Sequence, residues 1–357
     1  MKAPFSLYLD SITPALRAMV DDLSGRYEYV SVLSTDSVGF QLAISQHSKS
    51  VSNSNMTTER GTVVRVMKDG RYSEFAFNDA DLADPAQALA RLDREMEAQT
   101  ALLEKTGSRV YSTAALADEP LTLFVEKETG ELPEAADMKA LVDSFVALSD
   151  RGMETIPGAL DCNVRGISTH ISKLFLTKNR FLRQSYVYTE GSIVSFSPTE
   201  KGDVKIVYTG VSGLGGPEIL AGLSAKMEKA PKQMEDLLRS KSIEPGEYEI
   251  ITEPGVTGLI AHEAFGHGVE MDMFVKGRAL GAEYIGKRVG SDLVTMHEGA
   301  LCDDSVTAYA FDDEGTLAGD VIEIDRGILR TGICDALAAL RLGTVPTGNG
   351  KREKFSH

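Results

Sequence analysis

The sequence predicts an α+β protein whose N-terminal α/β region carries helices on a β meander. Two observations support this class. Apolar residues recur at helical spacing in several stretches, and β-rich runs bounded by turn residues fill residues 27–78 and 160–212. A chain of 357 residues is long enough for two or three domains, each with a core of its own.

The first predicted elements are a helix and a group of short strands. Thr13 is a suitable N-cap and Pro14 suits the first helical position, so we expect a helix from there to Gly25. Asp69-Gly70 predicts a hairpin turn. The strands expected in this part are 27–33, 40–45, 62–67 and 72–77.

Helices and strands continue to mix in the rest of the N-terminal region. Glu190-Gly191 predicts a hairpin between strands 181–189 and 192–197. A long helix is expected from Pro217 to about residue 240, with an interruption near Pro231. The remaining expected elements are helices 84–106 and 134–150 and strands 120–126 and 204–211.

The main domain boundary is expected near Glu244-Pro245-Gly246, because these residues break the chain after the long helix. This boundary divides the chain into an N-terminal α/β region, residues 1–245, and a C-terminal domain that begins at residue 246 and runs to 357. A division of the first region into two subdomains near residue 110 stays open.

Composition excludes several classes of function. The formal net charge is -16, from 37 basic and 53 acidic residues, and no basic stripe is present, so we expect no nucleic-acid partner. No stretch has the length of a membrane span, and no signal peptide is visible at the start, so we expect neither membrane attachment nor export. Three widely spaced cysteines fit a reducing compartment, and we expect a cytoplasmic protein.

The chemistry of the chain is concentrated in residues 262–267, which read His-Glu-Ala-Phe-Gly-His. A strand over 248–252 and a helix over 256–270 are expected around them. Neutral imidazoles hold zinc, an open coordination position carries a water of lowered pKa, and a neighbouring glutamate takes its proton. His262 and His267 are therefore candidate zinc ligands, and Glu263 is a candidate general base.

The spacing of the two histidines departs from the usual helical motif, in which they lie four residues apart. A five-residue offset on an ideal α-helix turns them about 140° away from each other. A one-residue bulge, or a break at Gly266, would bring the rings together, and glycines at 266 and 268 make such a departure easy. Two unrelated histidines remain the alternative.

Other polar residues near the motif have open roles. Glu270 and Asp272 suit acceptors that orient the histidine rings, Glu270 also suits a third ligand, and both are equally compatible with a solvated helix end. The other histidines (His47, His170 and His297) and the cysteines (Cys162, Cys302 and Cys334) fit surface positions or ordinary packing better than metal binding.

Several ordered motifs resemble the TldD/PmbA family of zinc metallopeptidases, once labelled modulators of DNA gyrase. The segment from His262 to Asp272 resembles the family's HEAxGHxxExD pattern. Other matching segments are 60–66, Gly70-Arg71, 312–316 (DDEGT), 326–329 and 347–350. The resemblance covers most of the chain, and the His-Glu motif points to the TldD-like branch rather than the PmbA/TldE-like branch.

The resemblance implies His262 and His267 as zinc ligands and Glu263 as the catalytic base. It implies short or unfolded peptides as substrates, a homodimer or a heterodimer with a PmbA/TldE-like subunit, and a C-terminal region rich in antiparallel strands around the metal-binding helix.

One departure from the family concerns the third ligand, a cysteine that lies far downstream in a Gly-x-Cys-Gly-like segment. None of the three cysteines has that context, so we expect a C-terminal domain that lacks part of the site. A catalytically incomplete scaffold or peptide-binding regulatory subunit is therefore the alternative function. Direct action on gyrase or DNA is disfavoured by the negative charge.

Overall fold

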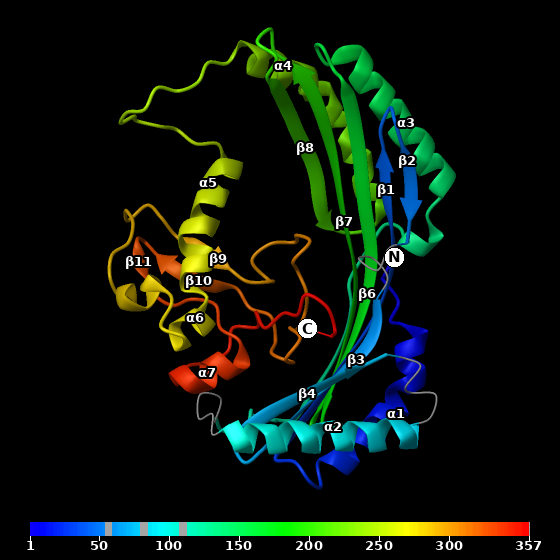
Figure 1. Ribbon diagram of the computed structural model, residues 1–357, viewed down its shortest axis with the longest axis vertical. Helices are drawn as coiled ribbons and strands as arrows, with labels where there is room; N and C mark the ends of the chain where they lie inside the picture. The colour runs from blue at the N-terminus through cyan, green and yellow to red at the C-terminus, as the bar shows by residue number, and fades with distance from the viewer. Residues whose placement is uncertain (54–58, 79–84, 107–112, 357) are drawn as a thin grey trace.

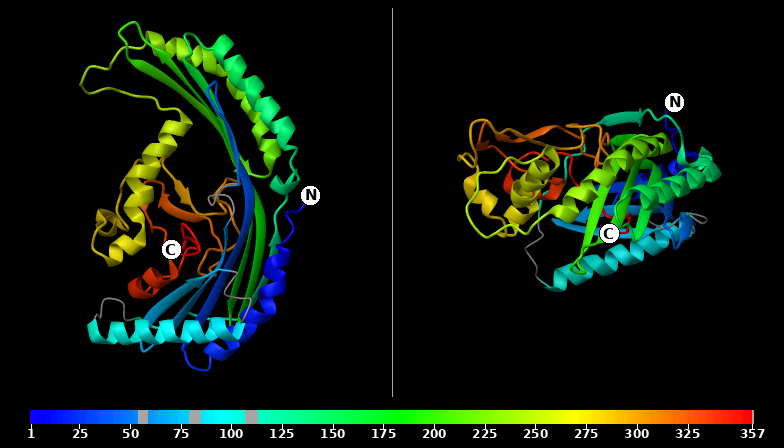
Figure 2. Two further views of the ribbon diagram at one scale, coloured as in Figure 1. Left: turned by 45° about the vertical axis from the view of Figure 1, so that its right-hand side comes forward. Right: turned by 90° about the horizontal axis from the view of Figure 1, so that it is seen from above.

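The computed structural model describes residues 1–53, 59–78, 85–106 and 113–356, and a long, strongly curved sheet dominates it (Figures 1 and 2). The strand order is β4-β3-β1-β6-β7-β5, with β2 added against β1 and β8 against β7. The pairs are antiparallel except for β5 with β7. The strands are β1 (Tyr29–Ile44), β2 (Lys49–Ser52), β3 (Glu59–Lys68), β4 (Arg71–Phe77), β5 (Leu121–Glu126), β6 (Asp161–Thr177), β7 (Arg180–Pro198) and β8 (Val204–Leu214).

Four helices cover the convex face of this sheet (Figure 2). Alternate residues of the strands point to this face, as the pleat requires. They form one core with α1 and α2 and a second core with α3 and α4. The helices are α1 (Leu7–Leu23), α2 (Pro85–Thr106), α3 (Met138–Thr155) and α4 (Leu223–Arg239), with 3-10 turns at Pro133–Ala135 and Pro217–Gly222. The expected α+β class is confirmed.

The central strands are longer than the sequence predicted. The turn expected at Glu190-Gly191 is wrong, because β7 runs through both residues and Gly191 pairs with Gly166 on β6 and Val211 on β8. A Cβ atom on Gly191 would lie 2.7 Å from the Leu220 side chain. The glycine therefore permits close packing of the turn before α4, and it does not reverse the chain.

Other helix boundaries also differ from those that the sequence predicted. Helix α1 begins at Leu7, where the Ser6 side chain accepts a hydrogen bond from the Leu9 amide, and Pro14 lies inside the helix. Its start at Thr13 was wrong because the first turn already buries Leu9. Pro231 likewise lies inside a continuous α4. The predicted helix start at residue 84 and the open division near residue 110 fall outside the described residues.

The C-terminal region lies against the concave face of the sheet (Figure 2). Phe311 is fully buried there in a small core with Leu33, Phe175 and Leu182. The strand expected over 248–252 is absent, and Ile251 is fully exposed. The regular elements are α5 (Pro254–Ala261), a π-helical turn (His262–Gly266), α6 (Met271–Val275), α7 (Ala336–Leu342), 3-10 turns at His267–Val269 and Leu280–Tyr284, and a small antiparallel sheet of β9 (Met296–Glu298), β10 (Val321–Asp325) and β11 (Ile328–Leu329).

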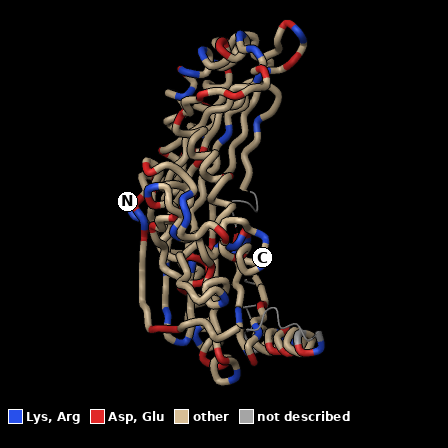
Figure 3. The backbone as a smooth tube through the Cα atoms, turned by 90° about the vertical axis from the view of Figure 1, so that its left-hand side faces the viewer, with Lys and Arg blue, Asp and Glu red and all other residues tan. Residues whose placement is uncertain are grey.

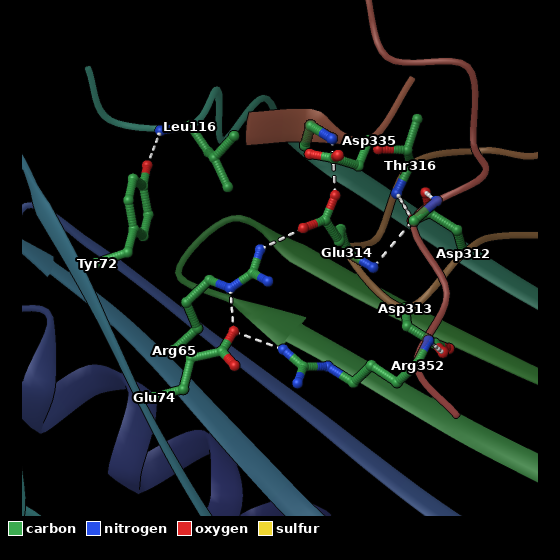
Figure 4. A network of polar contacts seen from close by, with 12 residues as sticks. Arg65, Tyr72, Glu74, Leu116, Asp312, Asp313, Glu314, Thr316, Asp335 and Arg352 are labelled. Atoms are coloured by element: carbon green, nitrogen blue, oxygen red, sulfur yellow. Dashed lines mark hydrogen bonds and ion pairs between the residues drawn. The ribbon is translucent and has the colours of Figure 1, made fainter. Parts of the chain in front are cut away.

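A network of charged side chains joins the two regions (Figure 4). Arg65 on β3 donates to Glu74 on β4 and, over 2.5 Å, to Glu314 of the C-terminal region. Arg352 donates to the same Glu74 carboxylate at 2.5 Å. Glu314 also accepts the Ala336 amide at 2.7 Å, so the start of α7 depends on this carboxylate.

The acidic loop 312–316 is held at several further points. Asp312 accepts the amides of Glu314 and Thr316, both at 2.9 Å, and the amide of Gly350 at 2.8 Å. Asp313 pairs with the buried Lys173 of β6. Carboxylates that accept several hydrogen bonds fix a loop firmly, so this segment anchors the C-terminal region on the sheet.

Basic and acidic residues lie interspersed along the chain in the view of Figure 3. Within the described ranges, no helix has both the length and the apolar character that a membrane span needs.

The network predicts that Arg65→Met destabilises the protein. The Arg65 and Glu314 side chains are 14% and 9% exposed, and loss of one partner leaves a buried charge uncompensated. We expect a loss of about 3–5 kcal/mol in the free energy of unfolding, measured by urea denaturation. The control is Lys139→Ala, which removes a surface pair with Asp143. Equal stability of R65M and the wild type would contradict the account.

Glu323 on β10 gives a pH-dependent prediction. It is fully buried, and no described residue donates a hydrogen bond to its carboxylate within normal geometry. Burial first, and the Glu298 charge second, raise its pKa to about 8, although the nearby Ile333 amide opposes the shift. Ionisation therefore favours the unfolded chain as pH rises from the ordinary glutamate pKa towards 8, and stability falls over that window.

Glu323→Gln removes this ionisation. We expect E323Q to have a higher urea midpoint than the wild type at pH 8. The difference between the two midpoints should be smaller at pH 5. A difference that is constant with pH would show that Glu323 does not titrate in this way.

Candidate metal centre

The helix that carries the histidines changes its winding at the motif. Helix α5 ends at Ala261, and residues His262–Gly266 form a π-helical turn. The His267 amide bonds to the carbonyl of His262, five residues back. A π turn accommodates one more residue than an α turn, so residues five apart come to lie on one side. The bulge expected from the spacing is therefore present.

The turn brings the two imidazoles together. The ring centroids of His262 and His267 lie 4.5 Å apart, with the ring planes at 68°. One ligand atom each from His262, Glu263 and His267 lies within 4.8 Å of the others. All three side chains are exposed.

Gly266 suits its position for a different reason from the one expected. Its backbone has ordinary helical angles, with φ -52° and ψ -63°, so it does not use glycine's conformational freedom. A Cβ atom at this position would lie 3.3 Å from the ring nitrogen Nδ1 of His262, tighter than ordinary contact. Gly268 has no such neighbour within 4 Å. Gly266 therefore leaves room for the His262 ring in its present position.

Glu270 orients His267. The Nδ1 atom of His267 lies 2.8 Å from Oε1 of Glu270, and this hydrogen bond is the main cause that raises the pKa of His267. A carboxylate on Nδ1 leaves Nε2 as the free ligand atom, which is the usual arrangement behind metal-binding histidines. Asp272 does not share this role, because it binds Lys276 at 2.6 Å. Of the two acids, only Glu270 contacts a ring of the motif.

The donor set fits zinc. Tetrahedral zinc with nitrogen bonds of 2.0–2.1 Å places its ligand atoms about 3.4 Å apart. His262 is exposed, so rotation of its side chain can bring a ring nitrogen towards that separation from His267, whose ring Glu270 holds. Imidazole ligands also suit zinc, whereas magnesium and calcium prefer oxygen ligands.

The cysteines do not belong to this group of side chains. Cys162 and Cys334 are buried, Cys302 is exposed, and all three are free thiols. Burial raises the pKa of the Cys334 thiol to about 12, which disfavours the thiolate that binds metal. Within the described residues, the side chains that lie close enough together to hold a metal ion are those of His262, Glu263 and His267.

Other histidines have structural partners. His170 lies between Glu134 and Ser185, at 2.8 and 2.9 Å, in the buried interior of the large sheet. His297 pairs with Asp320 at 2.8 Å. These pairs could not be predicted from local sequence patterns, because Glu134, Ser185 and Asp320 lie far from the histidines along the chain.

An apolar surface surrounds the motif on α5. Val256, Leu259 and Ile260 are each half exposed or more, and no residue of this helix is buried. The same helix appears in Figure 1 as a column that stands apart from the large sheet.

The C-terminal part matches a known family model. Residues 245–357 match the PmbA/TldA metallopeptidase C-terminal domain. The chain is similar to Metalloprotease MJ0996 of Methanocaldococcus jannaschii, with 26% identity over 270 residues, which cover 70% of this chain and 58% of the relative. It is also 30% identical to a Zinc metalloprotease TldD homolog of Saccharolobus solfataricus over 125 residues, or 35% of this chain and 28% of the relative. The chain thus spans little more than half of the first relative.

Solved structures share the fold. A Bacteroides thetaiotaomicron protein named for modulation of DNA gyrase superposes with a TM-score of 0.77 and 14% identity, over 96% of this chain and 76% of that one. TldE from Thermococcus kodakarensis superposes with a TM-score of 0.65 and 17% identity, over 95% and 74% of the two chains. The family match and the relatives lead to one conclusion: residues 245–357 form a C-terminal domain of the TldD/PmbA family, and most of the chain is similar to metalloproteases of that family.

Proposed function

We propose that this chain is a zinc-dependent peptidase of the TldD-like branch that acts on short or unfolded peptides. The observation that carries the proposal is the π turn, which places His262, Glu263 and His267 within ligand distance of one another. The names of the relatives, which include metalloprotease and zinc metalloprotease, support the same reading.

In this proposal His262 and His267 hold zinc through ring nitrogens, and Glu270 keeps His267 oriented with Nε2 outward. Zinc supplies a Lewis acid that polarises a peptide carbonyl and lowers the pKa of water. Glu263 acts as the general base: its carboxylate takes a proton from the attacking water and passes it to the leaving amine. Its exposed position beside both rings leaves it accessible to a peptide.

We also propose the assembly and location of the protein. The exposed apolar residues of α5 suit contact with a second subunit, either another copy or a PmbA/TldE-like protein, and the similarity in fold to TldE supports the second choice. Three free thiols suit the cytoplasm. Residues 1–245 would act as an N-terminal scaffold, and residues 246–357 as a metal-bearing domain.

A catalytically incomplete scaffold or peptide-binding regulatory subunit is the second candidate. It is favoured by the separation of Cys162, Cys302 and Cys334 from the histidines, since the described metal group then contains only two imidazoles and one carboxylate. Under this hypothesis the protein binds unfolded peptides without cleaving them.

Glu263→Gln tests the peptidase mechanism. Glutamine keeps the size of the side chain but cannot take a proton, so we expect hydrolysis of a fluorogenic unfolded peptide to fall by roughly 10²–10⁴-fold while zinc content stays unchanged. Wild-type activity in E263Q would exclude the base role. Zinc-loaded wild-type protein that binds the peptide without cleaving it would favour the scaffold hypothesis.

Glu270→Gln tests the orientation of His267. Loss of the carboxylate on Nδ1 should weaken zinc binding by roughly 10–100-fold, measured by competition with a chromogenic chelator. The matched control is Asp272→Asn, which removes an acid that binds Lys276 and not a ring. Similar zinc affinity in E270Q and D272N would contradict the assigned role of Glu270.

A further inference from the structure

A cavity of about 590 Å³ lies away from the histidine motif. Its floor is the concave face of β1, β6 and β7, and its walls come from residues 298–309 and 349–355. Lys173, Tyr186 and Tyr188 project from the floor, and Tyr309 and Lys351 contribute from the walls. Neither the histidine motif nor the proposed peptidase mechanism uses this cavity, although Asp313 and Asn349 of the segments 312–316 and 347–350 line it.

Two lysines in the cavity share one carboxylate oxygen. The Nζ atom of Lys173 pairs closely with Oδ1 of Asp313, and the Nζ atom of Lys351 lies 3.6 Å from the same oxygen. The other oxygen of Asp313 accepts the Arg352 amide at 2.9 Å. Asp313 therefore neutralises Lys173 and leaves Lys351 only partly compensated.

The surroundings of Lys351 favour a neutral amine. Burial first, and the adjacent ammonium of Lys173 second, lower the pKa of Lys351 to about 8, while the Asp313 and Asp312 charges oppose the shift. The Nζ atom also lies 4.4 Å from the ring centroid of Tyr309, a contact that favours the ammonium and so opposes the shift. The Lys351 side chain is still 36% exposed, so its amine remains accessible while it lines the cavity.

Two polar atoms of the cavity lining have no protein partner among the described residues. The Thr169 hydroxyl, on a side chain that is 1% exposed, and the Oδ1 atom of Asn349 make no hydrogen bond. Buried polar groups are normally paired, so these atoms are suited to hydrogen-bond a polar ligand. Glu59, Glu190 and Glu298 also line the cavity, together with Arg352 and Lys354, so its lining carries charges of both signs and suits a neutral polar ligand.

We propose that Lys351 is a nucleophilic lysine that captures small neutral aldehydes or ketones in this cavity. A lysine beside a second cation is a recognised way to obtain a reactive amine at neutral pH. The Nζ lone pair forms a bond to the carbonyl carbon, and the carbonyl oxygen takes up a proton to give a carbinolamine. Loss of water then leaves the imine, without any oxidant or reductant. Lys173 acts as a positioning residue whose charge increases the fraction of neutral Lys351 amine.

The test is reductive alkylation of the full chain with acetaldehyde and sodium cyanoborohydride at pH 8, followed by site-resolved mass spectrometry. The reference is Lys229, an exposed lysine on α4. We expect Lys351 to react at least roughly tenfold faster than Lys229. Equal or slower labelling of Lys351 in the folded protein overturns the proposal.

Lys173→Met separates the effect of charge from simple accessibility. Removal of the neighbouring ammonium should reduce the labelling rate of Lys351 to about that of Lys229. An unchanged ratio of the two labelling rates overturns the role of Lys173. Because Lys173 is buried, the pH profile of wild-type labelling gives a second measurement if K173M does not fold. Its midpoint should lie well below that of Lys229, and coincident midpoints overturn the proposal. Glu263→Gln should leave the labelling unchanged, which keeps this test independent of the peptidase proposal.

Discussion

The ion pair between Arg65 and Glu314 is the contact on which the arrangement of the two regions depends. It joins a strand of the large sheet to a loop 249 residues later in the chain. The same loop holds Gly350 through Asp312, Lys173 through Asp313 and the start of α7 through Glu314. A buried ion pair of this kind adds little net stability, but the loss of one partner is costly, so the network specifies one docking geometry. Both the histidine motif and the lysine cavity belong to the region that this geometry positions.

Within that region, the π turn determines how the two histidines of the motif are positioned. An α-helix would turn two histidines five residues apart away from each other, whereas the bulge places their rings in edge-to-face contact. Gly266 gives the His262 ring its space, and Glu270 fixes the other ring. The π turn, Gly266 and the Glu270 carboxylate thus position two exposed histidines in a way that suits zinc.

Local patterns predicted the parts of the fold that depend on local physics. Helical spacing located α2 to α4, and the Asp-Gly pair located the hairpin between β3 and β4, where Asp69 and Gly70 both have positive φ. The conflict between the five-residue spacing and α-helical geometry indicated either a bulge or a break at Gly266, and the structure has the bulge. The predicted turn at Gly191 and the predicted helix start at Pro14 were wrong because tertiary packing decides both positions. No local pattern reveals that Leu220 packs on Gly191 or that Leu9 is buried. Arg65, Lys173 and Glu323 are single charged residues within strands, and their importance appears only when residues distant in the chain are brought together.

The central claim is that the π turn forms a zinc centre from His262 and His267. Anomalous diffraction at the zinc edge, on crystals of the zinc-loaded chain, tests it most directly. The account predicts one strong peak within bonding distance of Nε2 of His267 and of a ring nitrogen of His262, with Glu270 still on Nδ1 of His267. A zinc peak at other side chains, or two rings that point apart in the presence of saturating zinc, would contradict it.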